Sequence, residues 1–483
     1  MMESHDDFDS QSQLQRALAD KITNYAPIEE IRYVLMRGAQ VDGQVTAGLT
    51  PLHYACYINY QAAAKLLLTL GAKVQAVDNI GCSALHLCAE HGHYRMIKLL
   101  LQYMKVVEQY ETPEFRVGDK YPQRENIDEP LRLAIKNGHY DCARLLLTNG
   151  ANPNAIYFDG PEITQVSPLD TNFLEMLLEF GADPNVFDRK GLTPIMKACR
   201  MKDKGIEAIR ILLKYGADIN KLSPERQDHR SALHFALLSG NHDLVKFLIA
   251  NGCNVNMDEK YEKPSPIDIA VLKDDPVLLK IVLDAGANPN AVHTYIGSCL
   301  HLASCSGKIL WFKKLNELKF LVLLNQYKIV ELLLEHGADM NLQHKFPDGS
   351  RLKSPFVEYF RSNDSIDAKV VKLFITHGAK VVMRNPLHDC RGQLRNVLKL
   401  AALQNQPEVL ELLLGLGEQY DNKAIERLPL PSELKTHISE RAKNPHSLQH
   451  LCRLQIRDTV QTSEYKTLPI PEFLKAYLLG LIP

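Results

Sequence analysis

The sequence has almost no net charge, since 56 Lys and Arg residues stand against 57 Asp and Glu residues. A chain with this balance has no general electrostatic attraction to nucleic acid or to an anionic membrane. It also lacks any run of about 18 apolar residues without a charge, so we expect no membrane-spanning helix. The acidic start, MMESHDDFDSQSQLQ, is unlike a secretory signal peptide.

The sequence also lacks the common motifs of catalysis. There is no GxxxxGK[ST] phosphate loop, no GxSxG elbow and no HExxH zinc helix. No pair of acidic residues stands out as a general acid and base. We therefore expect a protein that is not an enzyme and needs no cofactor.

Cysteine is present but unpaired in the sequence, with ten residues scattered singly through helical patterns. Without a signal peptide, this usage predicts reduced thiols in a cytosolic or nuclear protein.

One pattern recurs along most of the chain: a leucine-rich stretch that ends in Gly followed by a small residue and a polar turn. The spacing between these glycines is close to 33 residues in several places. Each glycine is expected to adopt the left-handed conformation that ends a helix. The glycines are Gly38, Gly71, Gly150, Gly181, Gly216, Gly252, Gly286, Gly337 and Gly378, with a weaker copy at Gly417.

The starts of the repeats agree with one another. They are TPLHYA at Thr50, SALHLC at Ser83, SALHFA at Ser231 and SCLHLA at Ser298. Ser or Thr can cap a helix, and Pro suits the first helical position. A fifth start, LTPIMKA, contains Thr193 and Pro194. A further one, SPLD at Ser167, lies so close to the next glycine that it predicts a shortened repeat.

A period near 33 with a Thr-Pro-Leu-His start resembles the ankyrin repeat. The resemblance covers roughly residues 11–426 and implies an all-α solenoid of about ten or eleven helix-turn-helix repeats over residues 1–426. Such arrays offer extended concave surfaces to partner proteins.

Two segments depart from the period. A polar stretch at about 105–128 predicts an exposed loop. Residues 307–324 form an 18-residue insert between the two helices of one repeat, and they carry the only tryptophan, Trp311. The insert is either an optional segment or an apolar protrusion that binds a partner.

The fixed positions of the repeat pattern also explain two clusters of Cys and His that superficially resemble zinc sites. Similar histidines follow the inter-helix glycine elsewhere, at His139 and near His242, so we expect no metal. The clusters are Cys82, His86, Cys88, His91 and His93, and Cys299, His301 and Cys305.

After a proline-bearing connector at 427–446, residues 447–457 read SLQHLCRLQIR. Ser447 can cap a helix, and the following apolar side chains share one helical face. They are Leu448, Leu451, Cys452 and Ile456.

The segment 468–478 follows, with the sequence LPIPEFLKAYL. Two prolines stiffen an extended stretch, and the second can open a final helix. The residues of interest are Leu468, Pro469, Ile470, Pro471, Leu474, Tyr477 and Leu478.

Together these two patterns resemble a SOCS box over residues 447–483, and the whole chain is identified as a member of the ankyrin repeat and SOCS box proteins. The resemblance implies that the first pattern is a BC box for elongin C of the elongin B/C heterodimer. It implies that the second is a cullin box for cullin-5 with its RING subunit. The alternative is a helical hairpin that closes an ankyrin scaffold without ligase activity.

The resemblance therefore implies a substrate receptor of a cullin-5 RING ubiquitin ligase that leads its target to ubiquitination and degradation. The target is expected at the turn tips and inner helix face of the array. The candidate contacts there are Asp78, Asn79, Asp188 and Arg189.

Overall fold

The computed structural model describes most of the repeat region and parts of the C-terminal region. It covers residues 5–108, 128–258, 261, 263–293, 297–305, 326–345, 351–363, 366–379, 387–388, 394–395, 407–414, 426, 430–443, 456 and 469–478. The chain divides into two compact units, residues 1–227 and 228–483.

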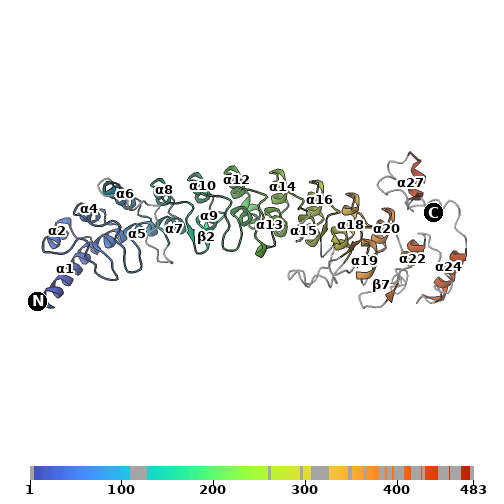
Figure 1. The fold of residues 1–483 in the computed structure, drawn as a ribbon, viewed down its shortest axis with the longest axis horizontal. Coiled ribbons are helices and arrows are strands. Elements are labelled where there is room, and N and C mark those ends of the chain that lie inside the picture. The colour runs from blue at the N-terminus through green and yellow to red at the C-terminus, as the bar shows by residue number, and fades with distance from the viewer. Residues whose placement is uncertain are drawn as a thin grey trace. The chain divides into compact units, whose positions relative to one another are not determined.

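The first unit is a series of antiparallel helix pairs. Helices α4, α6 and α8 form one row and α3, α5 and α7 pack side by side in a second row (Figure 1). Its elements are α1 (His5–Thr23), α2 (Ile28–Met36), α3 (Pro51–Tyr57), α4 (Gln61–Thr69), α5 (Ala84–His91), α6 (Tyr94–Glu108), α7 (Pro130–Lys136), α8 (Tyr140–Thr148), β1 (Ile156–Tyr157), β2 (Gly160–Pro161), α9 (Glu162–Gln165), α10 (Thr171–Glu179), α11 (Pro194–Cys199), the 3-10 turns η1 (Lys202–Gly205) and η2 (Glu225–Gln227), and α12 (Ile206–Lys214).

The second unit continues the same pattern and adds the C-terminal helices. Its elements are α13 (Ala232–Ser239), α14 (His242–Ala250), α15 (Pro266–Leu272), α16 (Pro276–Asp284), β3 (Val292–His293), β4 (Gly297–Ser298), α17 (Cys299–Ser304), α18 (Gln326–Glu335), β5 (His344–Lys345), β6 (Arg351–Leu352), α19 (Pro355–Ser362), α20 (Ala368–Thr376), β7 (Leu387–His388), β8 (Leu394–Arg395), α22 (Pro407–Leu414), α24 (Ser432–Lys443) and α27 (Glu472–Leu478). None of the helices in the described ranges is long and apolar enough to cross a bilayer.

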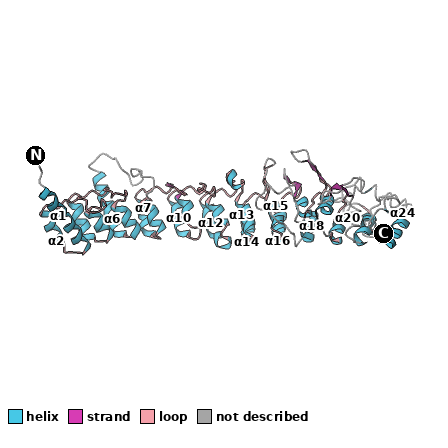
Figure 2. Cartoon of the chain, turned by 90° about the horizontal axis from the view of Figure 1, so that it is seen from below, coloured by secondary structure: helices cyan, strands magenta, loops and turns pink. Residues whose placement is uncertain are grey.

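The strands are short antiparallel hairpins in the loops between repeats, each pairing two residues with two. Within each unit, Figure 2 shows the helices along one side and these loops along the other. The all-α expectation is therefore confirmed for the body of the repeats, whereas the small hairpins were not predicted.

The predicted caps form at Thr50, Ser83, Ser231 and Ser298, and the histidine of each of these starts completes them. In the repeat at Ser83, the backbone N–H of Ser83 donates to Nδ1 of His86 at 3.0 Å. The same bond joins Ser298 to His301 at 3.1 Å, and Nε2 of His301 contacts the carbonyl oxygen of Lys353 at 2.9 Å. Since Nδ1 accepts, the neutral ring with its proton on Nε2 satisfies both bonds. The histidine thus fastens its helix to the following loop.

All nine of the strongly matching glycines have positive φ, between 82° and 109°. This confirms their predicted role as helix ends. Gly417 lies outside the described residues.

An asparagine ladder joins successive repeats on the loop side. Asn154 Nδ2 donates to the carbonyl oxygen of Gly181 at 2.9 Å, and the N–H of Asp183 donates back to Asn154 Oδ1 at 2.8 Å. Each rung therefore gives a hydrogen-bond partner to the carbonyl of the glycine that follows a helix. Donor asparagines at the same place in other repeats are Asn185, Asn256, Asn290 and Asn341.

Two sequence expectations need adjustment. Ser167 does not begin a helix: its carbonyl accepts from the N–H of Asp170 in a turn, and the first helix of that repeat is the earlier α9. The polar segment begins as helix, because α6 continues to Glu108, and its remainder to residue 127 lies outside the described residues.

Two further expectations concern the C-terminal half. The segment 306–325, which contains the insert, falls between α17 and α18 and is also outside the described residues. The predicted connector contains helix α24.

Substituting alanine for Gly205 is expected to lower the free energy of unfolding by about 3 kcal/mol, because a Cβ there has no room. An ideal Cβ would lie 2.0 Å from the carbonyl oxygen of Ala198, and the obstacle is backbone that cannot rotate away. Gly216→Ala is the matched control. Its Cβ would meet open space, and only the φ of +82° opposes it, which costs about 1 kcal/mol. Urea unfolding followed by circular dichroism measures both, and equal losses would contradict the steric argument.

Candidate functional site

Two regions carry the sequence-predicted contacts: the loops between repeats and the C-terminal segment. In the loop before α5, the carboxylate of Asp78 accepts from the N–H groups of Ile80 and Cys82 at 3.0 and 2.9 Å. The N–H of Asn79 donates to the carbonyl oxygen of Ala47 in the preceding loop at 2.9 Å. Asp78 therefore shapes its own turn, and the exposed apolar tip of this loop is Ile80.

The equivalent aspartate before α11, Asp188, is only 6% exposed. Its carboxylate accepts from the N–H of Leu192 at 2.8 Å and pairs with Lys197 Nζ at 2.8 Å. Burial alone would raise the pKa of Asp188, but the bonds from Lys197 and Leu192 outweigh it and hold the pKa below its usual value. The carboxylate is thus occupied within the chain.

Arg189 differs, because it is exposed and its guanidinium lies over the ring of Phe158, 4.2 Å from the centroid. Phe158 is itself 79% exposed. The two loops approach closely because residue 160 is glycine: a Cβ there would lie 2.9 Å from the Cα of Asp188. The pair offers a cation and an aromatic face to a partner. A target contact by Asp78, Asn79, Asp188 or Arg189 remains a prediction.

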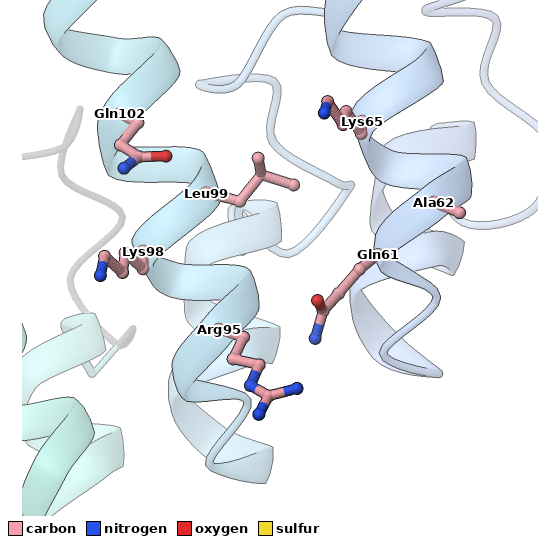
Figure 3. A pocket seen from close by; sticks show the side chains of 7 residues that line it. All are labelled: Gln61, Ala62, Lys65, Arg95, Lys98, Leu99 and Gln102. Atoms are coloured by element: carbon pink, nitrogen blue, oxygen red, sulfur yellow. The ribbon is translucent and has the colours of Figure 1, made fainter.

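A second surface feature is an open hollow of about 360 Å³ between α4 and α6 (Figure 3). Lys65, Arg95 and Lys98 line it, and none of the three has a carboxylate partner within the described part of the chain. The hollow offers positive charge but no buried polar group, so the surface lysines and arginine do not by themselves make a site.

Metal-binding side chains do not gather anywhere in the described ranges: no group of three or more His, Cys, Asp or Glu is placed to hold an ion. The histidines of the first cluster considered in the sequence instead make local bonds. His93 Nε2 contacts the carbonyl oxygen of Tyr57 at 3.1 Å, and burial is the main reason its pKa is lowered.

In the C-terminal segment, the structure describes residues 469–478 of the second pattern but only Ile456 of the first. Ile456 is helical and half-buried, but Leu448, Leu451, Cys452 and Leu468 lie outside the described residues.

The segment from Pro469 then forms a short bend followed by α27. Pro469 and Pro471 are exposed and Ile470 is half-buried. The carbonyl oxygen of Pro471 accepts from the N–H of Leu474 at 3.0 Å, so the second proline does precede the final helix as predicted.

The face of α27 that packs and the face that is exposed can be separated. Leu478 is buried and Leu474 is half-buried, while Tyr477 belongs to the same helix. Phe473, which the sequence did not single out, is 63% exposed. It falls beside the predicted stripe rather than on it, so a search for one apolar face does not find it. Exposed prolines and an exposed phenylalanine leave this end with apolar surface available to a partner.

This geometry defines a class: helix pairs with projecting loops, joined through glycine helix ends and histidine caps, form an ankyrin-repeat solenoid. Comparison with family models agrees. Models described as "Ankyrin repeats (3 copies)" match residues 22–111, 169–259 and 221–293, and an "Ankyrin repeat" model matches 128–157 and 298–345. Together they cover more than half of the chain. A "SOCS box" model matches residues 444–479. The chain belongs to the ankyrin repeat and SOCS box family.

Individual curated proteins are similar to parts of this chain. Inversin of Canis lupus familiaris is 26% identical over 240 residues, which is 46% of this chain and 20% of inversin. Dynein axonemal heavy chain 12 of Bos taurus is 26% identical over 387 residues, covering 69% of this chain and 95% of that protein. This chain thus spans only a fifth of the length of inversin.

Among solved structures, the human ASB11 ankyrin repeat domain is 23% identical with a TM-score of 0.37. The match covers 50% of this chain and 98% of that domain.

Proposed function

We propose that this chain is the substrate-recognition subunit of a cullin-5 RING E3 ubiquitin ligase. The ankyrin array would bind a target protein, and the C-terminal box would bind elongin B, elongin C and cullin-5. The observation that carries the proposal is the SOCS box match at residues 444–479, C-terminal to an ankyrin array on the same chain.

Ankyrin repeats and the SOCS box are non-catalytic adaptor modules, so the chain's role in the reaction is positional. Binding the target on one module and the ligase scaffold on the other raises the effective concentration of target lysines near the charged enzyme. The exposed Pro469 and Pro471 support the cullin contact, because a preset backbone lowers the ordering cost of binding.

The cysteines support a reducing compartment, the cytosol or the nucleus. The eight cysteines in the described part of the chain are all free thiols, and seven of them are buried. A disulfide-stabilised extracellular fold would use such residues in pairs.

The decisive experiment is co-expression of the full chain with elongins B and C, followed by size-exclusion chromatography with cullin-5 added. The wild type is expected to form a stable complex with all three proteins. Leu448→Ala combined with Cys452→Ala is expected to weaken elongin binding at least about a hundredfold, because both side chains are expected to fill an apolar pocket. The matched control is Arg453→Ala with Arg457→Ala, which lie off the apolar stripe and should leave the complex intact.

The cullin contact can be separated from the elongin contact. Pro469→Ala combined with Pro471→Ala is expected to retain elongins B and C and to lose cullin-5. A folded wild-type chain that binds no elongin would contradict the ligase role and leave an ankyrin scaffold protein.

A further inference from the structure

The repeat that begins at Ser265 differs from its neighbours at one buried position. Asp268 stands where other repeats have the capping histidine. In the repeat at Ser298, His301 reaches onward to the carbonyl oxygen of Lys353 at 2.9 Å. Asp268 is shorter and accepts only from Ser265, whose N–H and hydroxyl both donate to Oδ2, at 2.9 and 2.7 Å. Its second oxygen, Oδ1, has no hydrogen-bond donor among the described residues.

A hollow of about 520 Å³ opens at this place, between the loop that precedes α15 and the loop that follows α16. Asp268 lines it while remaining only 4% exposed as a residue. Ile267 and Val292 contribute apolar wall, and Asp258 is an exposed carboxylate in the lining. The hollow therefore combines apolar lining with the carboxylate of a largely buried aspartate, a composition found in binding pockets.

Among the described residues, no positive charge balances Asp268. Lys263, the one lysine among the described lining residues, pairs with Asp228 at 3.1 Å. In the repeat that begins at Glu129, the charged residue at the histidine position does have a counter-charge. Arg132 replaces the histidine there, and it pairs with Glu162 at 3.4 Å. Asp268 has no such ion pair among the described residues. A buried carboxylate without a counter-charge is costly, so a cation that enters the hollow would be bound favourably.

We propose that this hollow binds a lysine or arginine side chain of the target protein. The cationic head would bond to Asp268 Oδ1, and its aliphatic stem would pack on Ile267 and Val292, as long basic side chains commonly do. The inference deepens the proposed function, because it rests on the array being the target-binding module. It places a specificity contact in the second unit, whereas the loop residues picked out in the sequence belong to the first unit.

The test uses four libraries of immobilised heptapeptides that differ only in the central residue: arginine, lysine, citrulline or norleucine. Citrulline has the shape of arginine without its charge. The wild-type full chain is expected to be retained more strongly by the arginine and lysine libraries than by the two neutral ones. An equal retention on all four libraries would overturn the proposal.

Three variants make the test specific. Asp268→Asn keeps an acceptor for Ser265 but removes the charge, and Asp268→His restores the residue of the other repeats and also removes the charge. Both are expected to reduce the preference for the cationic libraries at least about tenfold. Asp258→Asn removes the same charge from the exposed lining and should change the preference by no more than about threefold.

Thermal unfolding identifies the folded variants, and Asp268→His keeps the test valid if the asparagine variant does not fold. An unchanged preference in folded Asp268→His would show that the cation binds elsewhere. Elongin binding is measured separately, so a complex with elongins and no cationic preference would reject this pocket alone. A cationic preference without elongin binding would reject the ligase role alone.

Discussion

Replacing Phe374 with alanine is expected to lower the free energy of unfolding of the second unit by about 4 kcal/mol. Phe374 is fully buried, and its ring centroid lies 5.5 Å from that of Phe356 and 6.1 Å from that of Tyr359. Removing the ring leaves a cavity between α19 and α20 that rigid aromatic neighbours cannot close. Urea unfolding followed by circular dichroism measures the loss.

Two control variants distinguish lost packing from a general effect of the substitution. Phe374→Leu keeps most of the volume and is expected to cost about 1.5 kcal/mol. Phe473→Ala changes an exposed ring and should stay within about 0.5 kcal/mol of the wild type. A Phe374→Ala loss no larger than that of the leucine variant would contradict the role of the aromatic cluster.

The second large effect is a loss of folding stability on acidification. His86, His234 and His301 are buried, and desolvation lowers the pKa of each to about 4. In the unfolded chain each has a pKa near 6.5, so the unfolded state takes up protons first as the pH falls. The stability present above pH 6.5 is lost progressively toward pH 4. Between pH 7 and pH 5 each histidine is expected to cost about 2 kcal/mol.

Buried carboxyls act in the opposite direction. Burial raises the pKa of Glu162 to about 7 and that of Asp268 to about 6, and it also raises the pKa of Glu358. Their ionisation penalty is present at pH 7 and is relieved as they are protonated on acidification. The net loss of stability between pH 7 and pH 5 is therefore expected to be about 2 kcal/mol, smaller than the histidines alone would give.

A single variant isolates the histidine contribution. His234→Gln retains an acceptor for the N–H of Ser231 in the manner of a capping box, but it cannot be protonated. Its loss of stability between pH 7 and pH 5 should be smaller than that of the wild type by about 2 kcal/mol. Urea unfolding at the two pH values tests this, and identical pH dependence in variant and wild type would contradict it.

The sequence predicted the repeat architecture well because the signals are local. A glycine that ends a helix and a Ser or Thr that caps one depend on a few neighbouring residues, and those at Gly38, Gly181 and Ser83 all appear as expected. The histidine of the start was recognised as part of the repeat, but its bonds were not. Its function lies partly in the next loop, as His301 and Lys353 show, and a spacing pattern does not reveal that contact.

In the shortened repeat, a local sequence signal predicted a helix start that the structure does not have. Ser167-Pro168 has the composition of a helix start, but the hairpin of β1 and β2 places the first helix at Glu162 instead. Local propensity at Ser167 is satisfied by a turn: the N–H of Leu169 donates to Ser167 Oγ at 3.2 Å. The hollow at Asp268 could not be predicted from the sequence either, because it depends on the space that the neighbouring loops leave unfilled.

The asparagine ladder has a consequence for how such a protein can vary in length. Asn256 bonds to Gly286, 30 residues later, whereas Asn290 makes the same bond to Gly337, 47 residues later. The same hydrogen bond therefore forms whatever the length of chain between the asparagine and the glycine, provided that the flanking helices pair. Insertions such as 307–324 can enlarge one repeat without altering the step from that repeat to the next. The spacing of such an array is therefore set by whole repeats rather than by residue number, so loops can be lengthened without changing the step between neighbouring repeats.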